Sequence, residues 1–394
     1  MSKILLSNMT VYAEERVFKN GYVLIENGKI LDVGPQEKLA VTDERVEKIE
    51  SKNNYAVIPG FIDLHIHGAA GADTMDGTDE AIRKMAAALP REGTTSFLAT
   101  TMTSSEQRIE EALINVRKYM ETANEPGYAE VLGVHLEGPF ISPKRAGAQH
   151  SENILEPNLQ LFKKWQHMSG GAIKLVTLAP ERKGGIELTD YLKQTGVVAS
   201  IGHSDASYAE AAKSIQAGIT HATHLFNGMS GLHHRKPGAA LAVLMHDEVL
   251  CEIIADGIHV CPEMVKFAYQ NKGNDGLILI TDAMRAKCLG KGIYELGGQE
   301  VRVNEDRAVL RDGTLAGSIL KLNDAAKNMM AYTGCTLQDI IQMAAVNPAK
   351  QINVYDRKGS IAKGKDADLV VLNDRLEVVM TFCRGKLTYS QQEM

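Results

Sequence analysis

The feature of this sequence that most constrains its fold is a regular alternation of short apolar runs with helix-like stretches. Eight runs have the length and composition of buried strands, and most are separated by Ala-, Glu- and Lys-rich stretches that favour helices. Eight such strands predict a (β/α)8 TIM-like barrel, for which about 250 residues is typical. An open doubly wound sheet is the alternative, but no G-x-G-x-x-G follows the first strand. The runs are residues 57–67, 94–101, 131–137, 173–179, 197–203, 219–226, 251–256 and 277–282.

Both ends of the chain have β character instead. Asn27-Gly28 is a strong hairpin signal, VEKIE follows it, and ADLVVL with VVMTF lies near the C-terminus. Neither end is long enough for a core of its own. We therefore expect a small discontinuous β-sandwich domain from residues 1–56 and 357–394, with a barrel of residues 57–356 between them.

Two local patterns refine the barrel. The alternating valines of residues 292–317 predict a β-hairpin insertion after the eighth strand. Thr336 and Asp339 have the spacing of a capping box, so a helix should begin there and stop before Asn347-Pro348.

Composition excludes several classes of function. The 394 residues carry a formal charge of −6 and no basic tract, which argues against nucleic acid as a main partner. No apolar stretch has membrane length, and the N-terminus lacks a secretory apolar region. The five cysteines form no CxxC pair and are typical of reduced thiols in a cytoplasmic protein.

The first apolar run contains a candidate metal motif, PGFIDLHIHG. Residues two apart in a strand point to the same face, so His65 and His67 project together. Imidazole is a good ligand for zinc, iron and similar divalent cations. Two ordinary polar residues on a half-exposed strand are the alternative, and the other strand ends must decide between them.

Barrel enzymes carry their chemistry at the carboxyl ends of the strands. Seven of the twelve histidines fall at such ends here, which structural histidines would have no reason to do. The sequence therefore predicts a metal site on one rim. The residues that close the strands are His65 and His67, His135 and Glu137, His203, His221, His224 and Asn227, Asp256 and His259, and Thr281 and Asp282.

A bridging carboxylate divides these residues into two ligand sets. We expect His65, His67 and Glu137 around one cation, and Glu137, His203 and His224 around another. Asp282 suits a shared role as ligand and base. His135 could instead support ligands or pack, and His221 is more typical of a buried, hydrogen-bonded histidine. Such a site activates water and polarises a carbonyl, so hydrolysis is the expected reaction.

Nine segments spread over nearly the whole chain share a pattern with a known family. They are PGFIDLHIHG, HLEGPF, AGAQ, IGHSDA, THLFNGM, ADGIH, TDAM, TLAGS and GSIAKGKDADLVVL. Together they resemble the amidohydrolase superfamily and, within it, the N-acetylglucosamine-6-phosphate deacetylase branch. Many superfamily members carry a carboxylated lysine at the end of strand four, whereas Lys174 lies near the start of that strand here. Glu137 takes the bridging place, as in the deacetylase branch, and His65 with His67 resembles its two-metal members.

The resemblance implies hydrolysis of a phosphorylated acetylated amino sugar, in amino-sugar catabolism and cell-wall sugar recycling. Asp282 would take a proton from water and deliver it to the leaving amine. Arg235, in a cationic cluster that suits phosphate, would reach across a homodimer interface. Gln149 or His150 would meet the substrate, and we favour Gln149. The implied substrate-binding residues are Ala148, Gln149, Asn227, Gly228, Arg235, Asp256, Gly257, Ile258, His259, Leu315, Ala316 and Gly317.

Two other readings of the sequence stay open. One is a different amidohydrolase, such as a cyclic-amide hydrolase or dipeptidase. The missing strand-four lysine and the Arg235 cluster argue against it. The other is a non-enzymatic assembly protein of the same superfamily. The complete set of candidate metal ligands argues against it.

Overall fold

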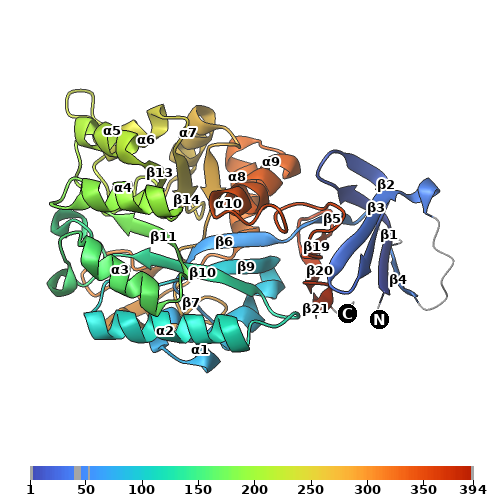
Figure 1. Ribbon diagram of the computed structural model, residues 1–394. Coiled ribbons are helices and arrows are strands. Elements are labelled where there is room, and N and C mark those ends of the chain that lie inside the picture. Colours follow the sequence, from blue (N-terminus) through green and yellow to red (C-terminus); the bar gives the residue numbers. More distant parts are fainter. Residues whose placement is uncertain (1–2, 40–45, 52–53, 392–394) are drawn as a thin grey trace.

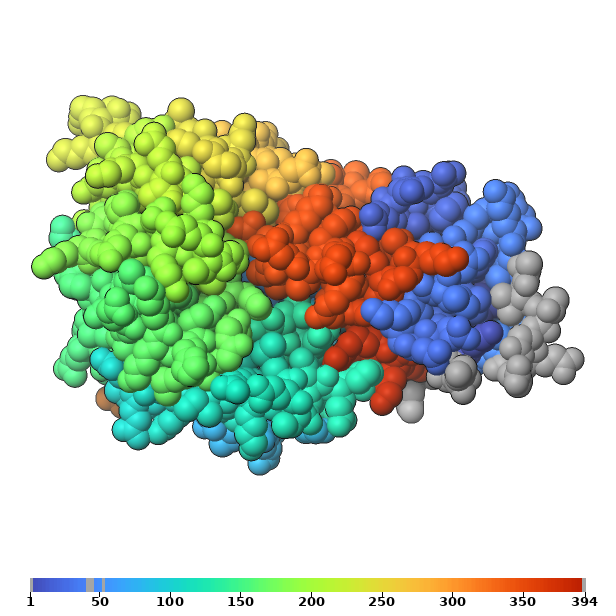
Figure 2. Space-filling view, in the orientation of Figure 1, coloured from blue at the N-terminus to red at the C-terminus, as the bar shows by residue number. Residues whose placement is uncertain are grey.

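The computed structural model describes residues 3–39, 46–51 and 54–391. It contains a barrel wrapped by helices and a separate sheet built from both ends of the chain (Figure 1). In the space-filling view, C-terminal residues lie between the barrel and the N-terminal strands (Figure 2). No helix in the described part of the chain has the length and apolar character needed to cross a membrane.

Eight parallel strands form the barrel, which confirms the predicted fold class. They follow one another around the sheet in chain order. A bridge between Ile66 and Ala283 and a 2.8 Å hydrogen bond from Asp282 N to His65 O bring the first and last strand regions together. The strands are β6 (Phe61–Ile66), β9 (Thr94–Thr100), β10 (Glu130–Glu137), β11 (Ile173–Leu178), β12 (Val198–Ile201), β13 (Ile219–Ala222), β14 (Leu250–Ile253) and β15 (Leu277–Leu279).

The helices bury one face against the strands and expose the other. In α2, Ile109, Leu113 and Val116 repeat at helical spacing and are fully buried. Ser207 and Glu210 form the capping box that begins α5. The helices are α1 (Asp79–Ala88), α2 (Glu106–Thr122), α3 (Leu159–Met168), α4 (Gly185–Thr195), α5 (Tyr208–Ala217), α6 (Ala239–Met245), α7 (Pro262–Lys272), α8 (Leu322–Thr333), α9 (Leu337–Ile341) and α10 (Asn347–Gln351).

The terminal sheet joins both ends of the chain, as expected. Its order is β21-β20-β19-β5-β1-β2-β3, and β4 also pairs with β1. Asn27 and Gly28, both with positive φ, form the predicted turn between β2 and β3. The strands are β1 (Lys3–Tyr12), β2 (Val17–Glu26), β3 (Lys29–Pro35), β4 (Val46–Glu50), β5 (Ala56–Pro59), β19 (Leu369–Leu372), β20 (Val378–Cys383) and β21 (Lys386–Ser390).

The first apolar run, expected as one barrel strand, is divided between the two sheets. β5 pairs with β1 and β19, whereas β6 pairs with β9. Gly60 lies between them, where an added Cβ would lie 2.1 Å from Thr95 Oγ1. The chain can therefore pass directly from one sheet to the other only with glycine at this point. The exact domain boundaries stay a prediction.

Buried ion pairs join the terminal segment to the barrel. Glu130, at the start of β10, lies 2.8 Å from Arg357 and 2.7 Å from Lys358. Lys358 also contacts Asp368, and Arg357 lies 2.7 Å from Asp366. These charges compensate one another at a junction that excludes most water.

Two predictions about the last third of the chain need refinement. The insertion after β15 is a three-stranded sheet, not a single hairpin: β16 (Gly292–Leu296), β17 (Gln299–Val303) and β18 (Ala308–Val309).

The helix that begins at the Thr336–Asp339 capping box does not stop before Asn347-Pro348, so that prediction was wrong. A π turn, η6 (Gln342–Val346), leads directly into α10. Pro348 then occupies the first turn of α10, where its missing N–H is not needed. The Asn347 side chain ties this turn to the barrel by donating to Leu277 O at 2.7 Å.

Candidate active site

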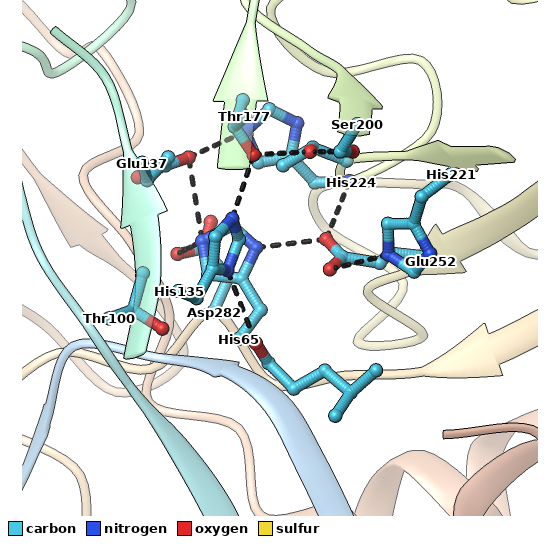
Figure 3. A network of polar contacts seen from close by, with 12 residues as sticks. His65, Thr100, His135, Glu137, Thr177, Ser200, His221, His224, Glu252 and Asp282 are labelled. Atoms are coloured by element: carbon cyan, nitrogen blue, oxygen red, sulfur yellow. Dashed lines mark hydrogen bonds and ion pairs between the residues drawn. The ribbon is translucent and has the colours of Figure 1, made fainter. Parts of the chain in front are cut away.

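The carboxyl ends of five barrel strands bring six candidate ligands together. Figure 3 labels four of them, His65, Glu137, His224 and Asp282. His65 lies on β6, with His67 just beyond its end, and Glu137 ends β10. His203, His224 and Asp282 follow β12, β13 and β15. All six are buried, although all six are charged or titratable groups that water would normally solvate. Such burial requires that the groups be paired or coordinate a cation. The six are His65, His67, Glu137, His203, His224 and Asp282.

The first ligand set surrounds the ends of β6 and β15. Asp282 Oδ1 lies 3.1 Å from His67 Nε2 and 3.5 Å from His65 Nε2. Glu137 adds its two oxygens, at 3.4 Å from His65 Nε2 and 3.3 Å from His67 Nε2. His65, His67 and Asp282 thus form one group, and Glu137, also expected from the sequence, contacts both of its histidines.

The second ligand set shares Glu137 with the first. Glu137 Oε1 lies 3.1 Å from both His203 Nε2 and His224 Nε2. The two imidazole nitrogens are themselves only 3.0 Å apart. All three atoms thus converge on one point, as ligands of a common ion would.

These distances and atoms fit divalent cations. Ligands about 2.1 Å from a tetrahedral cation lie about 3.4 Å from one another, close to the observed separations. His65 Nε2 is buried and has no hydrogen-bond partner among the described residues. An unpartnered buried nitrogen that faces two carboxylates is suited to bind a cation.

Three of the ligand residues also have unusual backbones. His203, His224 and Asp282 have φ of 47°, 31° and 47°, in the left-handed region that residues other than glycine rarely adopt. Such strain concentrates at functional sites, where it turns a side chain toward the position that the chemistry needs.

Electrostatics keep the bridging carboxylate ionised. Burial alone would raise the pKa of Glu137. The charge of His65 and hydrogen bonds from His203 and His224 outweigh it and hold that pKa well below its usual range. Glu137 therefore stays an anion that can serve both ligand sets.

His135 lies beneath the ligands and does not face the cavity. Its Nδ1 lies 3.1 Å from Leu64 O and its Nε2 lies 2.7 Å from Thr177 Oγ1, so both ring nitrogens have protein partners. Burial, and then the charge of His65, hold its pKa well below the usual value. A neutral His135 thus supports the floor of the site.

Sequence reasoning missed Glu252, a fully buried carboxylate on β14. Its oxygens lie 2.9 Å from His65 Nδ1 and 3.0 Å from His221 Nε2. The available signal was a glutamate inside the apolar run LCEII, four residues before Asp256, the predicted strand end. His221 is buried and hydrogen-bonded, as expected.

Asp63, on the same strand as His65, received no role from the sequence. It accepts hydrogen bonds from Thr281 Oγ1 at 2.6 Å and from His65 N at 3.2 Å. Burial raises its pKa to about 6. Asp63 therefore ties β6 to the segment that carries Asp282.

A cavity of about 230 Å³ opens above the ligands. Seven expected substrate-binding residues line it: Ala148, Gln149, Asn227, Gly228, His259, Leu315 and Gly317. Met102, Gly147, Leu296 and Thr314 also line it and were not expected. Leu296 lies on β16 of the three-stranded insertion, and Met102 lies just after β9. Both segments meet the cavity through packing between parts of the chain that are distant in sequence.

Five expected residues are absent from the described lining of this cavity. Asp256 instead holds His259, whose Nδ1 is 2.6 Å from Asp256 Oδ2. Ala316 is fully buried behind its neighbours. The five are Arg235, Asp256, Gly257, Ile258 and Ala316.

The loop that carries Arg235 is exposed. The amides of Arg235 and Lys236 both donate to His233 Nδ1, at 3.2 and 3.1 Å, which shapes a short turn. Arg235 is absent from the described lining of the cavity of its own chain.

Gln149, not His150, belongs to the cavity lining. The Gln149 amide donates to Glu137 Oε2 at 2.7 Å, and its oxygen accepts from Thr103 N at 2.7 Å. His150 follows it but lies outside the described lining.

Comparisons with known proteins agree with this geometry. The model of the amidohydrolase family matches residues 56–388. The chain is 47% identical to an N-acetylglucosamine-6-phosphate deacetylase of Bacillus subtilis (strain 168), over 99% of this chain and 98% of that protein. It is 36% identical to an N-acetylgalactosamine-6-phosphate deacetylase of Escherichia coli O157:H7, over 84% of this chain and 86% of that protein.

A solved structure is similar over nearly the whole chain. It is a mutant N-acetyl-D-glucosamine-6-phosphate deacetylase of Mycobacterium smegmatis in complex with N-acetyl-D-glucosamine-6-phosphate. The TM-score is 0.91 at 29% identity, covering 99% of this chain and 100% of that one.

Proposed function

This chain belongs to the amidohydrolase family, and we propose that it hydrolyses N-acetyl-D-glucosamine 6-phosphate to D-glucosamine 6-phosphate and acetate. The observation that carries the proposal is the convergence of six buried ligand-type side chains beneath a cavity. The deacetylase relatives, similar over nearly the full length of the chain, support this substrate class.

The family is metal-dependent, and the two ligand sets would hold one or two divalent cations per chain. We infer His65, His67 and Asp282 for one, His203 and His224 for the other, and Glu137 between them. Imidazole and carboxylate ligands are consistent with zinc or iron. When bound, a cation of this kind lowers the pKa of water and polarises an amide carbonyl.

Asp282 is the residue to which we assign proton transfer. Its carboxylate lines the cavity beside His67. Burial alone would raise the pKa of Asp282, but the charge of His65 outweighs burial and lowers that pKa. An ionised Asp282 can accept the proton of the attacking water and deliver it to the amine nitrogen as the carbon–nitrogen bond breaks. Acetate and the free amine are then the products.

The sugar and its phosphate would bind along the rim of the cavity. Asn227, Gly228 and Gln149 offer amide groups, and His259 is oriented by Asp256. Leu315 and Gly317 of the insertion would line the sugar side. We infer that Arg235 of a second subunit binds the phosphate, because its own chain leaves it exposed and away from the cavity. The expected assembly is a homodimer.

A second candidate substrate is N-acetyl-D-galactosamine 6-phosphate. The relative from Escherichia coli O157:H7 that is 36% identical favours it. The two sugars differ only in the orientation of one hydroxyl group, and the described lining offers polar groups to either. The 47% identity to the glucosamine-type relative makes the first substrate our choice.

We also propose that the enzyme works in the cytoplasm. All five cysteines are free thiols, which suits a reducing compartment.

A substrate panel tests the proposed function. Protein loaded with zinc or iron is incubated separately with N-acetylglucosamine 6-phosphate, N-acetylgalactosamine 6-phosphate and unphosphorylated N-acetylglucosamine, and free amine is measured. We expect the highest kcat/KM for the first. A higher value for the second sugar would favour the second candidate, and no turnover of any of them with cation bound would refute deacetylation.

A further inference from the structure

Glu252 is a fully buried carboxylate on β14, one residue before the last residue of that strand. An isolated charge in such a place is costly, so its partners define what it does. Oε2 lies 2.9 Å from His65 Nδ1 and accepts a 3.0 Å hydrogen bond from His224 N. Oε1 lies 3.0 Å from His221 Nε2. Figure 3 shows all three contacts meeting at this one carboxylate.

The contact with His65 fixes the form of that imidazole. An ionised carboxylate only accepts hydrogen bonds, so His65 must donate from Nδ1. When a cation takes the place of a proton on Nε2, the ring keeps its Nδ1 proton and binds the cation through the Nε2 lone pair. That nitrogen faces Glu137 and Asp282 and has no hydrogen-bond partner among the described residues. Glu252 therefore holds His65 in the tautomer that can bind a cation.

The contact with His224 concerns the backbone. His224 has φ of 31°, a conformation that needs support from its surroundings. The hydrogen bond from its amide to Glu252 supplies that support. His224 Nε2 then lies 3.1 Å from Glu137 and 3.0 Å from His203. One carboxylate thus orients a residue of each ligand set.

The other ligand histidines do not share this arrangement. His203 Nδ1 lies 2.7 Å from the carbonyl oxygen of Arg145, a neutral partner. His67 Nδ1 and His224 Nδ1 are buried without a hydrogen-bond partner in the described part of the chain. Among these four imidazoles in the described chain, His65 is the one with a carboxylate at Nδ1, the nitrogen that faces away from the ligand set, and this makes it the more basic ligand.

We propose that Glu252 is a positioning residue that prepares His65 to bind a cation and couples the two ligand sets through His224. The His65–His67–Asp282 set depends on its charge, and both sets depend on its hydrogen bonds. This inference rests on the proposed function in one respect, namely that the two sets hold divalent cations.

Two substitutions separate the charge from the hydrogen bonds. Glu252→Gln keeps the shape and an oxygen that can accept from His65 and His224, but it removes the negative charge. Glu252→Leu removes both. Glu130→Gln is the matched control, because it also removes a buried carboxylate from an ion-pair network but touches none of the ligands.

The readouts are the number of cations per chain, the affinity for zinc by chelator competition, and the absorption spectrum of the cobalt-loaded protein. We expect two cations in the unchanged protein and in Glu130→Gln. Glu252→Gln should bind one cation normally and the other about 10- to 100-fold more weakly, with a changed cobalt spectrum. Glu252→Leu should weaken both sites.

Two cations bound with unchanged affinity and spectrum in both Glu252 variants would overturn the inference and leave the proposed function intact. A single cation in the unchanged protein would overturn the coupling of the two ligand sets, and no cation there would overturn the proposed function. If the variants do not fold, ¹⁵N NMR of the unchanged, histidine-labelled and zinc-loaded protein tests the inference by showing which ring nitrogen of His65 carries the proton. A proton on His65 Nδ1 supports the inference, and a proton on Nε2 overturns it.

Discussion

The side-chain amide of Gln149 donates a 2.7 Å hydrogen bond to Oε2 of Glu137, the carboxylate shared by both ligand sets. The other oxygen of Glu137 faces His203 and His224. Gln149 is itself fixed, since its carbonyl oxygen accepts from Thr103 N at 2.7 Å. The orientation of the bridging carboxylate therefore depends on a neutral side chain from the loop after β10.

Replacing Gln149 should loosen that carboxylate. We expect Gln149→Leu to weaken cation binding by about 10-fold, as removal of a ligand's hydrogen-bond partner generally does. Zinc affinity by chelator competition measures the effect. Gln299→Leu is the control, because Gln299 donates to Ala148 O in the same loop but does not contact Glu137. Equal effects of the two variants would mean that the loop, and not this hydrogen bond, matters.

Asp282→Asn should separate cation binding from proton transfer. The amide has the same shape but cannot accept the proton of water at neutral pH. We expect the variant to keep bound cation and to lose about 10²- to 10⁴-fold in kcat. Metal analysis and steady-state kinetics on the same preparation test this. Full activity would remove the acid–base role from Asp282.

Arg235→Ala tests the proposed phosphate contact. We expect KM for the phosphorylated sugar to rise far more than KM for the unphosphorylated sugar, because only the former loses a charge-assisted hydrogen bond. Arg311→Ala, which removes another exposed arginine, is the control. An equal rise for both sugars would refute phosphate recognition by Arg235.

Mixed dimers test whether Arg235 acts across an interface. A dimer of one Arg235→Ala chain and one Asp282→Asn chain has one site with an intact Asp282 and the Arg235 of the other subunit. At a substrate concentration where each variant alone has little activity, co-expression of the two should therefore restore activity to at most half of the normal value. No recovery in mixed dimers would place Arg235 in its own chain's site or outside any site.

Acid should weaken the junction between the barrel and the terminal segment. Burial raises the pKa of Glu130, but the charge of Lys358 and hydrogen bonds from Arg357 outweigh it and lower the pKa overall. A carboxyl group whose pKa is lower in the folded than in the unfolded chain contributes stability above the unfolded value of about 4.3. That stability is lost as the pH falls further, through the folded pKa.

The matching variant is Glu130→Gln. We expect it to lower the free energy of unfolding at pH 7 by about 1.5–3 kcal/mol, the range for a hydrogen bond to a charged group. The difference from the unchanged protein should shrink between pH 5 and the acid limit of folding, where Glu130 is protonated anyway. Urea unfolding at several pH values measures this. A difference that is independent of pH would exclude the charge of Glu130 as its cause.

The sequence predicted the barrel and the converging ligands because both follow from local patterns. Apolar runs identify strands, and the carboxyl ends of parallel strands share one rim, so His65, Glu137 and His203 could be placed together. Glu252 was not predicted as part of the site because it lies inside a strand, where only the three-dimensional packing shows that it contacts His65.

Other features depend on contacts distant in sequence. The division of residues 57–67 at Gly60 follows from the close approach of Thr95. The continuation of the helix through Pro348 follows from a π turn and from the bond of Asn347 to Leu277. The contribution of Met102 and Leu296 to the cavity likewise follows from how separate segments pack.

The most direct test of the central claim follows acetate release by ¹H NMR. Protein loaded with a divalent cation is mixed with N-acetyl-D-glucosamine 6-phosphate, and free acetate and free amine are measured over time. We predict that both appear at the same rate, that a chelator stops the reaction, and that added zinc or iron restores it. No acetate from protein with confirmed bound cation, or undiminished release after the cation is removed, would contradict this account.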